Sequence, residues 1–292
     1  MEPGIYYDIP FNEYLKIDAF SKSLVYECLK SPKHLKHCID SPEESTKIMD
    51  FGSLVDCMVF EPGQVKNRFA MIPEKYINSK KIEMPFTMQS NTCKAIIAGI
   101  ESSGKTAMKA VDFDRAEKIF EEIKSHPEAS KWVSLSRHQV TIIWTDPETK
   151  TLCKGRMDGY IDKIGEQRIV DLKITENPFP GAFSRIANQF NYHVQGAMYH
   201  HGLYCAVSGK YPDGWVIPFS LIVAESEQPH ETICYNMDSE SLDVGVEKFK
   251  RAIQVYVECK ENNEWPGYSS VAEELKIPMW AINRLMLEGV YE

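Results

Sequence analysis

The fold follows from two stretches, Gly155-Arg156-Met157-Asp158-Gly159-Tyr160 and Ile169-Val170-Asp171-Leu172-Lys173. The second stretch is rich in residues that favour strands, and the first lies in residues 151–164, which read as the returning strand after the turn at 146–150, so the two can form neighbouring strands of one sheet. Asp171 and Lys173 are two residues apart, so both side chains leave the same face of their strand. The residues that alternate with them are apolar, which indicates that the opposite face is buried.

A carboxylate and an ammonium held side by side, with Asp158 supplied by the neighbouring strand, form an oxygen-rich pocket beside a fixed positive charge. Mg²⁺ prefers oxygen ligands and usually takes one or two protein carboxylates. The pattern therefore favours phosphodiester hydrolysis, in which Lys173 would stabilise the developing negative charge or orient and help deprotonate the attacking water. The alternative is a structural salt bridge between Asp171 and Lys173, because Asp-x-Lys tripeptides are common.

A second group of polar residues lies in a predicted helix. Gln195 and Tyr199 are one helical turn apart, and Tyr192 lies on the same stripe. Such a stripe could hydrogen-bond a phosphate or the region of Lys173. An aromatic core stripe with a satisfied amide would give the same spacing, so the spacing alone leaves both readings open.

Composition restricts the class of protein. The 292 residues carry 33 basic and 42 acidic side chains, a net charge of −9, which argues against general coating of DNA. Eight cysteines are scattered without a close pair, which argues against a zinc ribbon or a cysteine-ligated cluster. There is no membrane-spanning apolar run and no signal-peptide pattern, so we expect a cytoplasmic protein without a membrane partner.

The order of predicted elements indicates a mixed sheet with helices on its faces, an α/β or α+β core. No Gly-, Ser- or Pro-rich linker forces a division into domains. Helices are predicted from 21 or 23 to 38, and over 46–60, 92–102, 112–124, 180–208 and 239–262. Strands are predicted over 138–145, 151–164, 168–175 and 214–224.

Three motifs in this order resemble the exonuclease VIII (RecE) family of phage and prophage recombination nucleases. They are Gly-Arg-x-Asp at 155–158, Val-Asp-Leu-Lys at 170–173 and Tyr-His-Val-Gln-x-Ala-x-Tyr at 192–199. The likeness extends over nearly the whole chain, through stretches 3–9, 21–24, 51–62, 144–149 and 264–266. Several ordered motifs together are far less probable by chance than any one of them.

The resemblance implies a PD-(D/E)xK restriction-endonuclease-like core in a single nuclease domain over 1–292. Residues 1–45 would form a cap that binds DNA ends, 46–262 the catalytic core and 263–292 a C-terminal helical extension. The metal ligands would be Asp158, Asp171 and the Leu172 carbonyl, with Lys173 as the catalytic lysine and Gln195 and Tyr199 as the supporting helix motif.

The same resemblance implies an activity. Members of the family digest linear double-stranded DNA from its ends, usually removing the 5′-ended strand. The 3′ overhang is then used by a single-strand annealing protein. Mg²⁺ would be the cofactor, with Mn²⁺ as a substitute, and a ring-like homo-oligomer, trimeric or tetrameric, would be the assembly.

Two positions depart from the family pattern. Asp56 stands where the first helix motif usually carries His, and a carboxylate there can reach a metal directly or through water. Its alternative role is to cap a helix or form a salt bridge. Gln139 stands where relatives often carry Glu, and an amide is a weaker ligand. Met157 replaces a Pro that is not a ligand.

DNA contacts are predicted at two places. Ser21, Lys22 and Ser23 lie where a helix begins, and exposed backbone N–H groups there suit a terminal 5′-phosphate. Ordinary helix capping explains the serines equally well. Arg156 alternates onto the face of Asp158 and could contact the DNA backbone, or could form a salt bridge.

Two other functions fit the same residues. An endonuclease or structure-specific nuclease could use the same metal core, because end specificity depends on the shape of an oligomeric channel. A catalytically weakened DNA-binding protein is the other reading, motivated by Asp56 and Gln139. The intact residues Asp158, Asp171 and Lys173 argue against it.

Overall fold

The computed structural model describes residues 1–41, 46–78, 80–163, 165–206, 217–279 and 283. Its centre is a six-stranded sheet in the order β1-β6-β7-β8-β9-β10. Only β8 and β9 pair in parallel; the other neighbours are antiparallel. The strands are β1 (Gly4–Tyr6), β6 (Arg137–Thr145), β7 (Leu152–Ile161), β8 (Arg168–Thr175), β9 (Phe219–Glu225) and β10 (Thr232–Asn236). The mixed α/β sheet is therefore confirmed.

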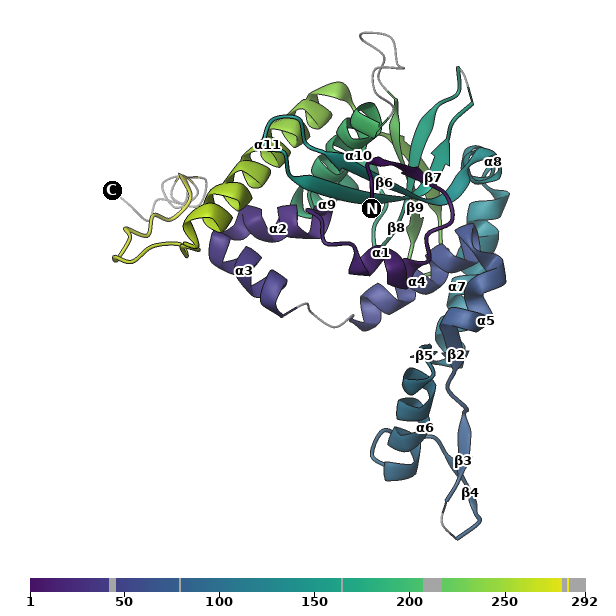
Figure 1. The fold of residues 1–292 in the computed structure, drawn as a ribbon. Helices are drawn as coiled ribbons and strands as arrows, with labels where there is room; N and C mark the ends of the chain where they lie inside the picture. The colour runs from purple at the N-terminus through teal and green to yellow at the C-terminus, as the bar shows by residue number, and fades with distance from the viewer. Residues whose placement is uncertain (42–45, 79, 164, 207–216, 280–282, 284–292) are drawn as a thin grey trace.

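Helices cover both faces of the sheet (Figure 1). On one face a core that includes Trp144, Leu203 and Phe219 packs under α2 (Lys22–Lys30), α3 (Pro32–Asp40), α9 (Pro180–Gln189), α10 (Tyr192–Ala206) and α11 (Ser239–Asn262). On the other face a core that includes Leu54 and Ile222 packs under α4 (Lys47–Phe60), α7 (Ala110–Ser125) and α8 (Pro127–Leu135). None of the described helices combines the length and apolarity that crossing a membrane requires.

Two predicted helices are each divided in two, so those predictions were wrong. The helix predicted to run to residue 38 breaks at Ser31, where Pro32 cannot continue the hydrogen-bond ladder and Ser31 instead caps α3. The helix predicted over 180–208 breaks at Phe190 and Asn191, because Asn191 has the left-handed φ of 52°.

Most other boundaries agree within a few residues, α11 among them. Strands β1 and β10 and helix α8 were not predicted. The strand expected from 214 is β9, beginning at Phe219; residues 207–216 lie outside the described residues. Of the expected helical extension over 263–292, the described residues 263–278 carry no helix, whereas 279 and 283 are helical; 280–282 and 284–292 lie outside the description.

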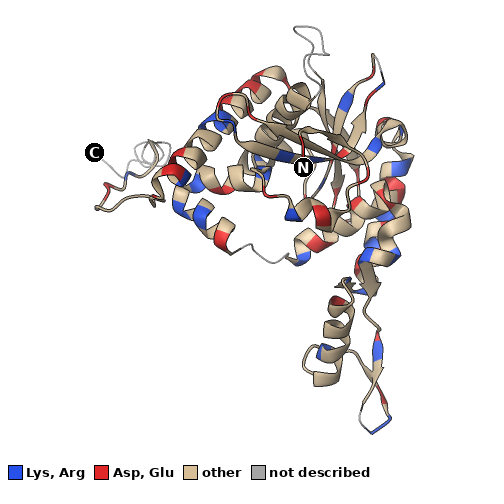
Figure 2. Cartoon of the chain, viewed as in Figure 1, with Lys and Arg blue, Asp and Glu red and all other residues tan. Residues whose placement is uncertain are grey.

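An arm projects from the body (Figure 1). It leaves through η1 (Pro62–Gln64) and α5 (Val65–Arg68), and contains the parallel pair β2 (Phe69–Met71) and β5 (Thr106–Met108), the hairpin β3 (Lys75–Ile77)–β4 (Glu83–Pro85) and α6 (Asn91–Ser102). Residues 69–108 contain five lysines and three glutamates, so the arm is basic although the chain is acidic (Figure 2). A short helix, α1 (Phe11–Lys16), follows β1.

The packing of α11 against α10 depends on Gly245. A Cβ there would lie 2.3 Å from the His193 carbonyl oxygen, a backbone atom that cannot move aside. We expect Gly245→Ala to lower the free energy of unfolding by about 1–3 kcal/mol, measured by urea denaturation.

A matched helical glycine provides the control. A Cβ at Gly99 in α6 would meet nothing within 4 Å. We therefore expect Gly99→Ala to leave stability unchanged or raise it by up to ~1 kcal/mol. Equal destabilisation by the two variants would contradict the packing contact.

Candidate active site

The site lies where β7 and β8 separate. Their pairing ends at Gly159↔Val170, one residue short of Asp158 and Asp171, which the same register would place opposite each other. Beyond that point β8 remains paired with β9, beginning with Asp171↔Leu221. The Leu172 N–H donates to Asp158 Oδ2 at 2.8 Å and holds this carboxylate in the fork between the strands. The two predicted carboxylates thus meet at one point of the sheet.

Asp171 is 1% exposed and is held by two donors. Gln195 Nε2 donates to its Oδ1 at 2.6 Å, and the Lys173 ammonium forms an ion pair with its Oδ2. A carboxylate has about four lone-pair positions, so each oxygen can still bind a cation. Asp171 and Lys173 form the ion pair expected from their spacing, and Gln195 of α10 is the third residue of the group.

Tyr199 fixes Gln195 in this position. Its hydroxyl accepts from Gln195 Nε2 at 3.2 Å and donates to the Arg156 carbonyl at 2.7 Å. Gly155 makes the approach possible, because a Cβ there would lie 2.8 Å from the Tyr199 ring. The need for this glycine was missed, although its place beside the Arg-x-Asp motif was the available signal.

The two departures from the family pattern are in contact with each other. Gln139 Nε2 donates to Asp56 Oδ2 at 2.9 Å, and Gln139 Oε1 accepts from Arg156 Nε at 2.9 Å. Gln139 interrupts β6 with a φ of 53°, opposite Asp158 in the register of β6 and β7. Asp56 Oδ1 is buried without a hydrogen-bond partner among the described residues. Asp56 lies inside α4, whose N-cap is Thr46, and forms no salt bridge with a residue that the structure describes, so neither of its alternative roles is seen.

Burial and neighbouring charges raise the pKa of Asp158 and of Asp56. Burial, followed by the charges of Asp171 and Asp56, raises the pKa of Asp158 well above its usual range. Burial also raises the pKa of Asp56 to about 7, with Arg68 opposing the shift and Asp171 adding to it. Burial lowers the pKa of Lys173, but the charges of Asp171 and Asp158 outweigh it and the net shift is upward. The cluster thus holds more carboxyl groups than the Lys173 ammonium could balance if all of them were ionised.

These donors fit a hard divalent cation. The candidate metal ligands of the site are all oxygen atoms. Two buried oxygens, one on the Asp56 carboxylate and one on the Gln195 amide, have no hydrogen-bond partner among the described residues. Within the described part of the chain, no three His, Cys, Asp or Glu side chains converge as a ready-made metal cluster. The Asp158–Asp171 pair is therefore the centre of the candidate metal site, with Asp56 beside it.

The N-terminal end of α2 lies next to this site. Two ammonium groups lie over the ring of Tyr192: that of Lys173 is 4.8 Å and that of Lys22 is 5.9 Å from the ring centroid. Burial, followed by the charge of Lys173, lowers the pKa of Lys22 to about 8, while the charges of Asp171 and Asp158 oppose the shift. Ser21 is the N-cap residue of α2 but its side chain makes no cap hydrogen bond, and Ser23 is exposed.

Arg156 instead directs its donors into the protein. Its Nη1 donates to the Ile9 carbonyl at 2.7 Å and to Thr141 Oγ1 at 3.4 Å, and the rings of Phe11 and Tyr14 lie 5.8 Å away. Among the described residues it forms no salt bridge, so that alternative was wrong. Its visible role is to hold the segment before α1 against the sheet.

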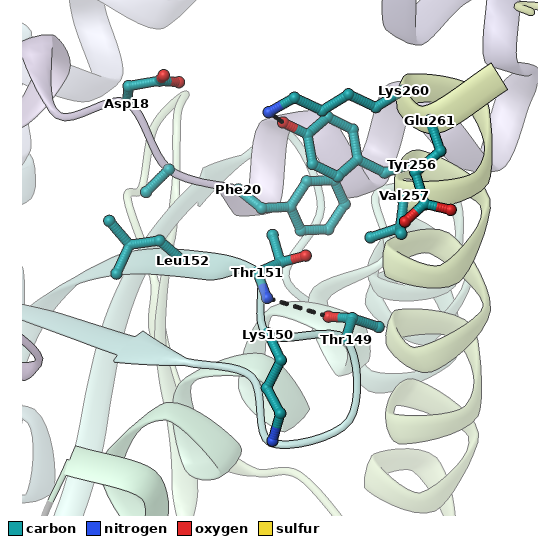
Figure 3. Close-up of a pocket in the computed structure, with 11 residues that line it drawn as sticks. Asp18, Phe20, Thr149, Lys150, Thr151, Leu152, Tyr256, Val257, Lys260 and Glu261 are labelled. Carbon is teal, nitrogen blue, oxygen red and sulfur yellow. Dashed lines mark hydrogen bonds between the residues drawn. The ribbon is translucent and has the colours of Figure 1, made fainter. Parts of the chain in front are cut away.

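Two hollows lie elsewhere. One, of about 310 Å³, is lined by Phe20, Lys150, Tyr256 and Lys260 at the edge of α11 (Figure 3). Another, of about 370 Å³, lies between α9 and the start of α11. The first contains none of the site residues described above, so we place the chemistry at the fork rather than in that cavity.

Comparison with known proteins agrees with this geometry. Residues 21–278 match the family model described as a PDDEXK-like domain of unknown function (DUF3799). A solved structure from Eubacterium rectale, described as a "putative exonuclease", superposes with a TM-score of 0.59 at 15% identity, covering 94% of this chain and 98% of that one. The structure of SSO0001 gives a TM-score of only 0.34 at 11% identity, covering 84% and 81% of the two chains. No curated protein matches.

Proposed function

Because the chain belongs to the family of PDDEXK-like domains, a class of metal-dependent nucleases, we propose that it is an exodeoxyribonuclease acting on the ends of linear double-stranded DNA. It would remove the 5′-ended strand and leave 3′ overhangs for recombination. The observation that carries the proposal is the fork, where Asp171 is held between Gln195 and Lys173 and Asp158 lies in the adjoining strand.

Each side chain has a distinct task in this reaction. Asp158, Asp171 and the Leu172 carbonyl would hold Mg²⁺, or Mn²⁺ in its place, with Asp56 reaching it directly or through water. The bound cation supplies Lewis-acid activation of a water at neutral pH. Lys173 presents a positive charge to the phosphate under attack, and Gln195 keeps the Asp171 carboxylate in one orientation.

End specificity is tested by comparing substrates of the same length. Linear and covalently closed duplex DNA are incubated with and without Mg²⁺, using linear molecules with 5′-phosphate or 5′-hydroxyl ends. We expect loss of the linear duplex alone, and only with the metal. Equal degradation of closed circles would favour an endonuclease, and no metal-dependent loss of any DNA would favour a binding protein.

Gln195 supports a metal ligand rather than binding the metal itself. Its removal should therefore lower the rate of hydrolysis less than removal of a ligand does. We expect Gln195→Ala to reduce the rate of Mg²⁺-dependent hydrolysis by about 10–100-fold, because Asp171 loses its orienting donor. Gln254→Ala, an exposed glutamine on α11, is the control and should not change the rate. A Gln195→Ala rate equal to that of the control would remove the helix motif from the site.

The contact between Asp56 and Gln139 gives a test of the third acid. We expect Asp56→Asn to weaken Mn²⁺ binding, measured by calorimetry without DNA, because the neighbourhood loses a carboxylate. Adding Gln139→Glu should restore affinity, since an acid and an amide again face each other with their positions exchanged. Unchanged Mn²⁺ affinity in Asp56→Asn would show that Asp56 acts only as a structural partner, and failure of the second change to restore binding would show that the carboxylate must stand at position 56.

Assembly, partner and location complete the proposal. We propose a ring-like trimer or tetramer that encircles DNA and delivers its product to a single-strand annealing protein in the cytoplasm. The eight cysteines form no close pair along the sequence, which supports a reducing compartment. Light scattering coupled to gel filtration would give the number of subunits, and a monomeric mass would oppose the ring.

A further inference from the structure

An exposed aromatic side chain lies at the edge of the site. Phe190 follows α9 and has 43% of its surface exposed. Its ring stacks on that of Tyr192, with centroids 6.1 Å apart and an interplanar angle of 19°. Tyr192 in turn lies beside the ammonium groups of Lys173 and Lys22, at 4.8 and 5.9 Å. A continuous row of contacts therefore leads from the catalytic lysine to an exposed ring.

The turn that presents Phe190 is fixed by hydrogen bonds. The Phe190 N–H donates to the Ile186 carbonyl at 2.9 Å, and Asn191 Oδ1 accepts from the Lys248 ammonium at 3.0 Å. Behind Phe190, the ring of Tyr192 rests against the buried Phe183 at 6.1 Å. A ring held in one orientation loses little conformational freedom when another flat group stacks on it.

We propose that Phe190, backed by Tyr192, is a stacking platform for a nucleobase close to the scissile phosphate. This inference rests on the proposed nuclease function and specifies how the strand is held there. The Lys173 ammonium and the Phe190 ring lie 4.8 and 6.1 Å from the same Tyr192 centroid, so they are at most about three base steps of ~3.4 Å apart. A phosphate at Lys173 therefore leaves a base of the same strand within reach of the ring.

The neighbouring charges favour a nucleotide over an apolar protein partner. Lys22 and Lys173 attract the phosphates on either side of the base, while the aromatic row accepts its face. All four bases have such a face, so the platform holds the strand without selecting a sequence. Its contribution is non-ionic, in contrast to that of the lysines.

Phe179 provides a matched control at the other end of the same helix. It is 68% exposed, more than Phe190, and α9 places it about 15 Å away. If DNA binding depends on any exposed phenylalanine of this surface, replacing either Phe190 or Phe179 should weaken it. If Phe190 is a stacking platform, only its replacement should weaken binding of the DNA end.

The test uses the full chain and duplex DNA with 2-aminopurine at one of the first positions of the 5′-ended strand. Phosphorothioate linkages at the end slow hydrolysis, so that binding and fluorescence are read on intact DNA. We expect the wild-type protein to quench the probe. Phe190→Ala should lose the quenching and bind the end about 5–100-fold more weakly, whereas Phe190→Trp and Phe179→Ala should behave like wild type.

Salt dependence separates stacking from charge. The ratio of the wild-type and Phe190→Ala dissociation constants should stay the same between about 50 and 200 mM salt, because no counterion release is involved. Quenching by Phe190→Ala equal to wild type, or equal losses in Phe190→Ala and Phe179→Ala, would overturn the platform while leaving the nuclease in place. A wild-type protein that does not cut unmodified linear duplex would overturn both.

Discussion

Asp171→Asn is expected to reduce Mg²⁺-dependent hydrolysis of linear duplex DNA by about 10³-fold or more. The substitution keeps the size of the side chain but removes the charge on which Lys173 and Gln195 converge and which would bind the metal. Metal affinity should fall in parallel, because one of the two central carboxylates is lost. Initial rates on end-labelled duplex and Mn²⁺ calorimetry measure the two effects.

Folding must be separated from chemistry in this variant. Asp171→Asn leaves the Lys173 ammonium without its buried partner, so some stability is lost as well. Thermal unfolding shows whether the variant remains folded at the assay temperature, and Asp243→Asn, an exposed carboxylate on α11, controls for loss of one charge. A folded Asp171→Asn protein within tenfold of the wild-type rate would contradict the site.

Lys173→Met is the second substitution for which we expect a large loss of activity. We expect the turnover rate to fall by about 10²–10³-fold, because the charge that faces the phosphate is removed from a buried site. Metal affinity should not fall, since Lys173 is not a ligand and its loss frees Asp171 Oδ2. This combination, a slow enzyme that still binds metal, distinguishes the lysine from the aspartate.

Lys173→Arg gives a finer comparison. It keeps the charge but replaces a compact ammonium with a larger, planar guanidinium of different hydrogen-bond geometry. We expect only partial recovery of the rate. Loss of Mn²⁺ binding in Lys173→Met as large as that in Asp171→Asn would instead indicate that the lysine merely maintains the structure of the fork.

The parts of the site that could be predicted from sequence depend on short-range spacing. A two-residue period puts Asp171 and Lys173 on one face, and a four-residue period puts Gln195 and Tyr199 on one stripe. These periods hold whatever the tertiary fold, which is why the contact pairs Lys173–Asp171 and Gln195–Tyr199 are present.

Other features arise from contacts between distant residues. Gln139 and Asp56 are 83 positions apart, and no local pattern indicates their hydrogen bond. The ending of the β7–β8 pairing at Gly159 likewise depends on how β8 pairs with β9. By contrast, Pro32 did carry a signal for the break between α2 and α3, whereas the break at Asn191 has neither Pro nor Gly to mark it.

The most direct measurement is anomalous diffraction from crystals of the protein soaked in Mn²⁺. A peak between the carboxylates of residues 158 and 171, adjoining the carbonyl of residue 172, is the result we expect. Manganese bound elsewhere, or carboxylates too far apart to share it, would contradict a nuclease centre at the fork.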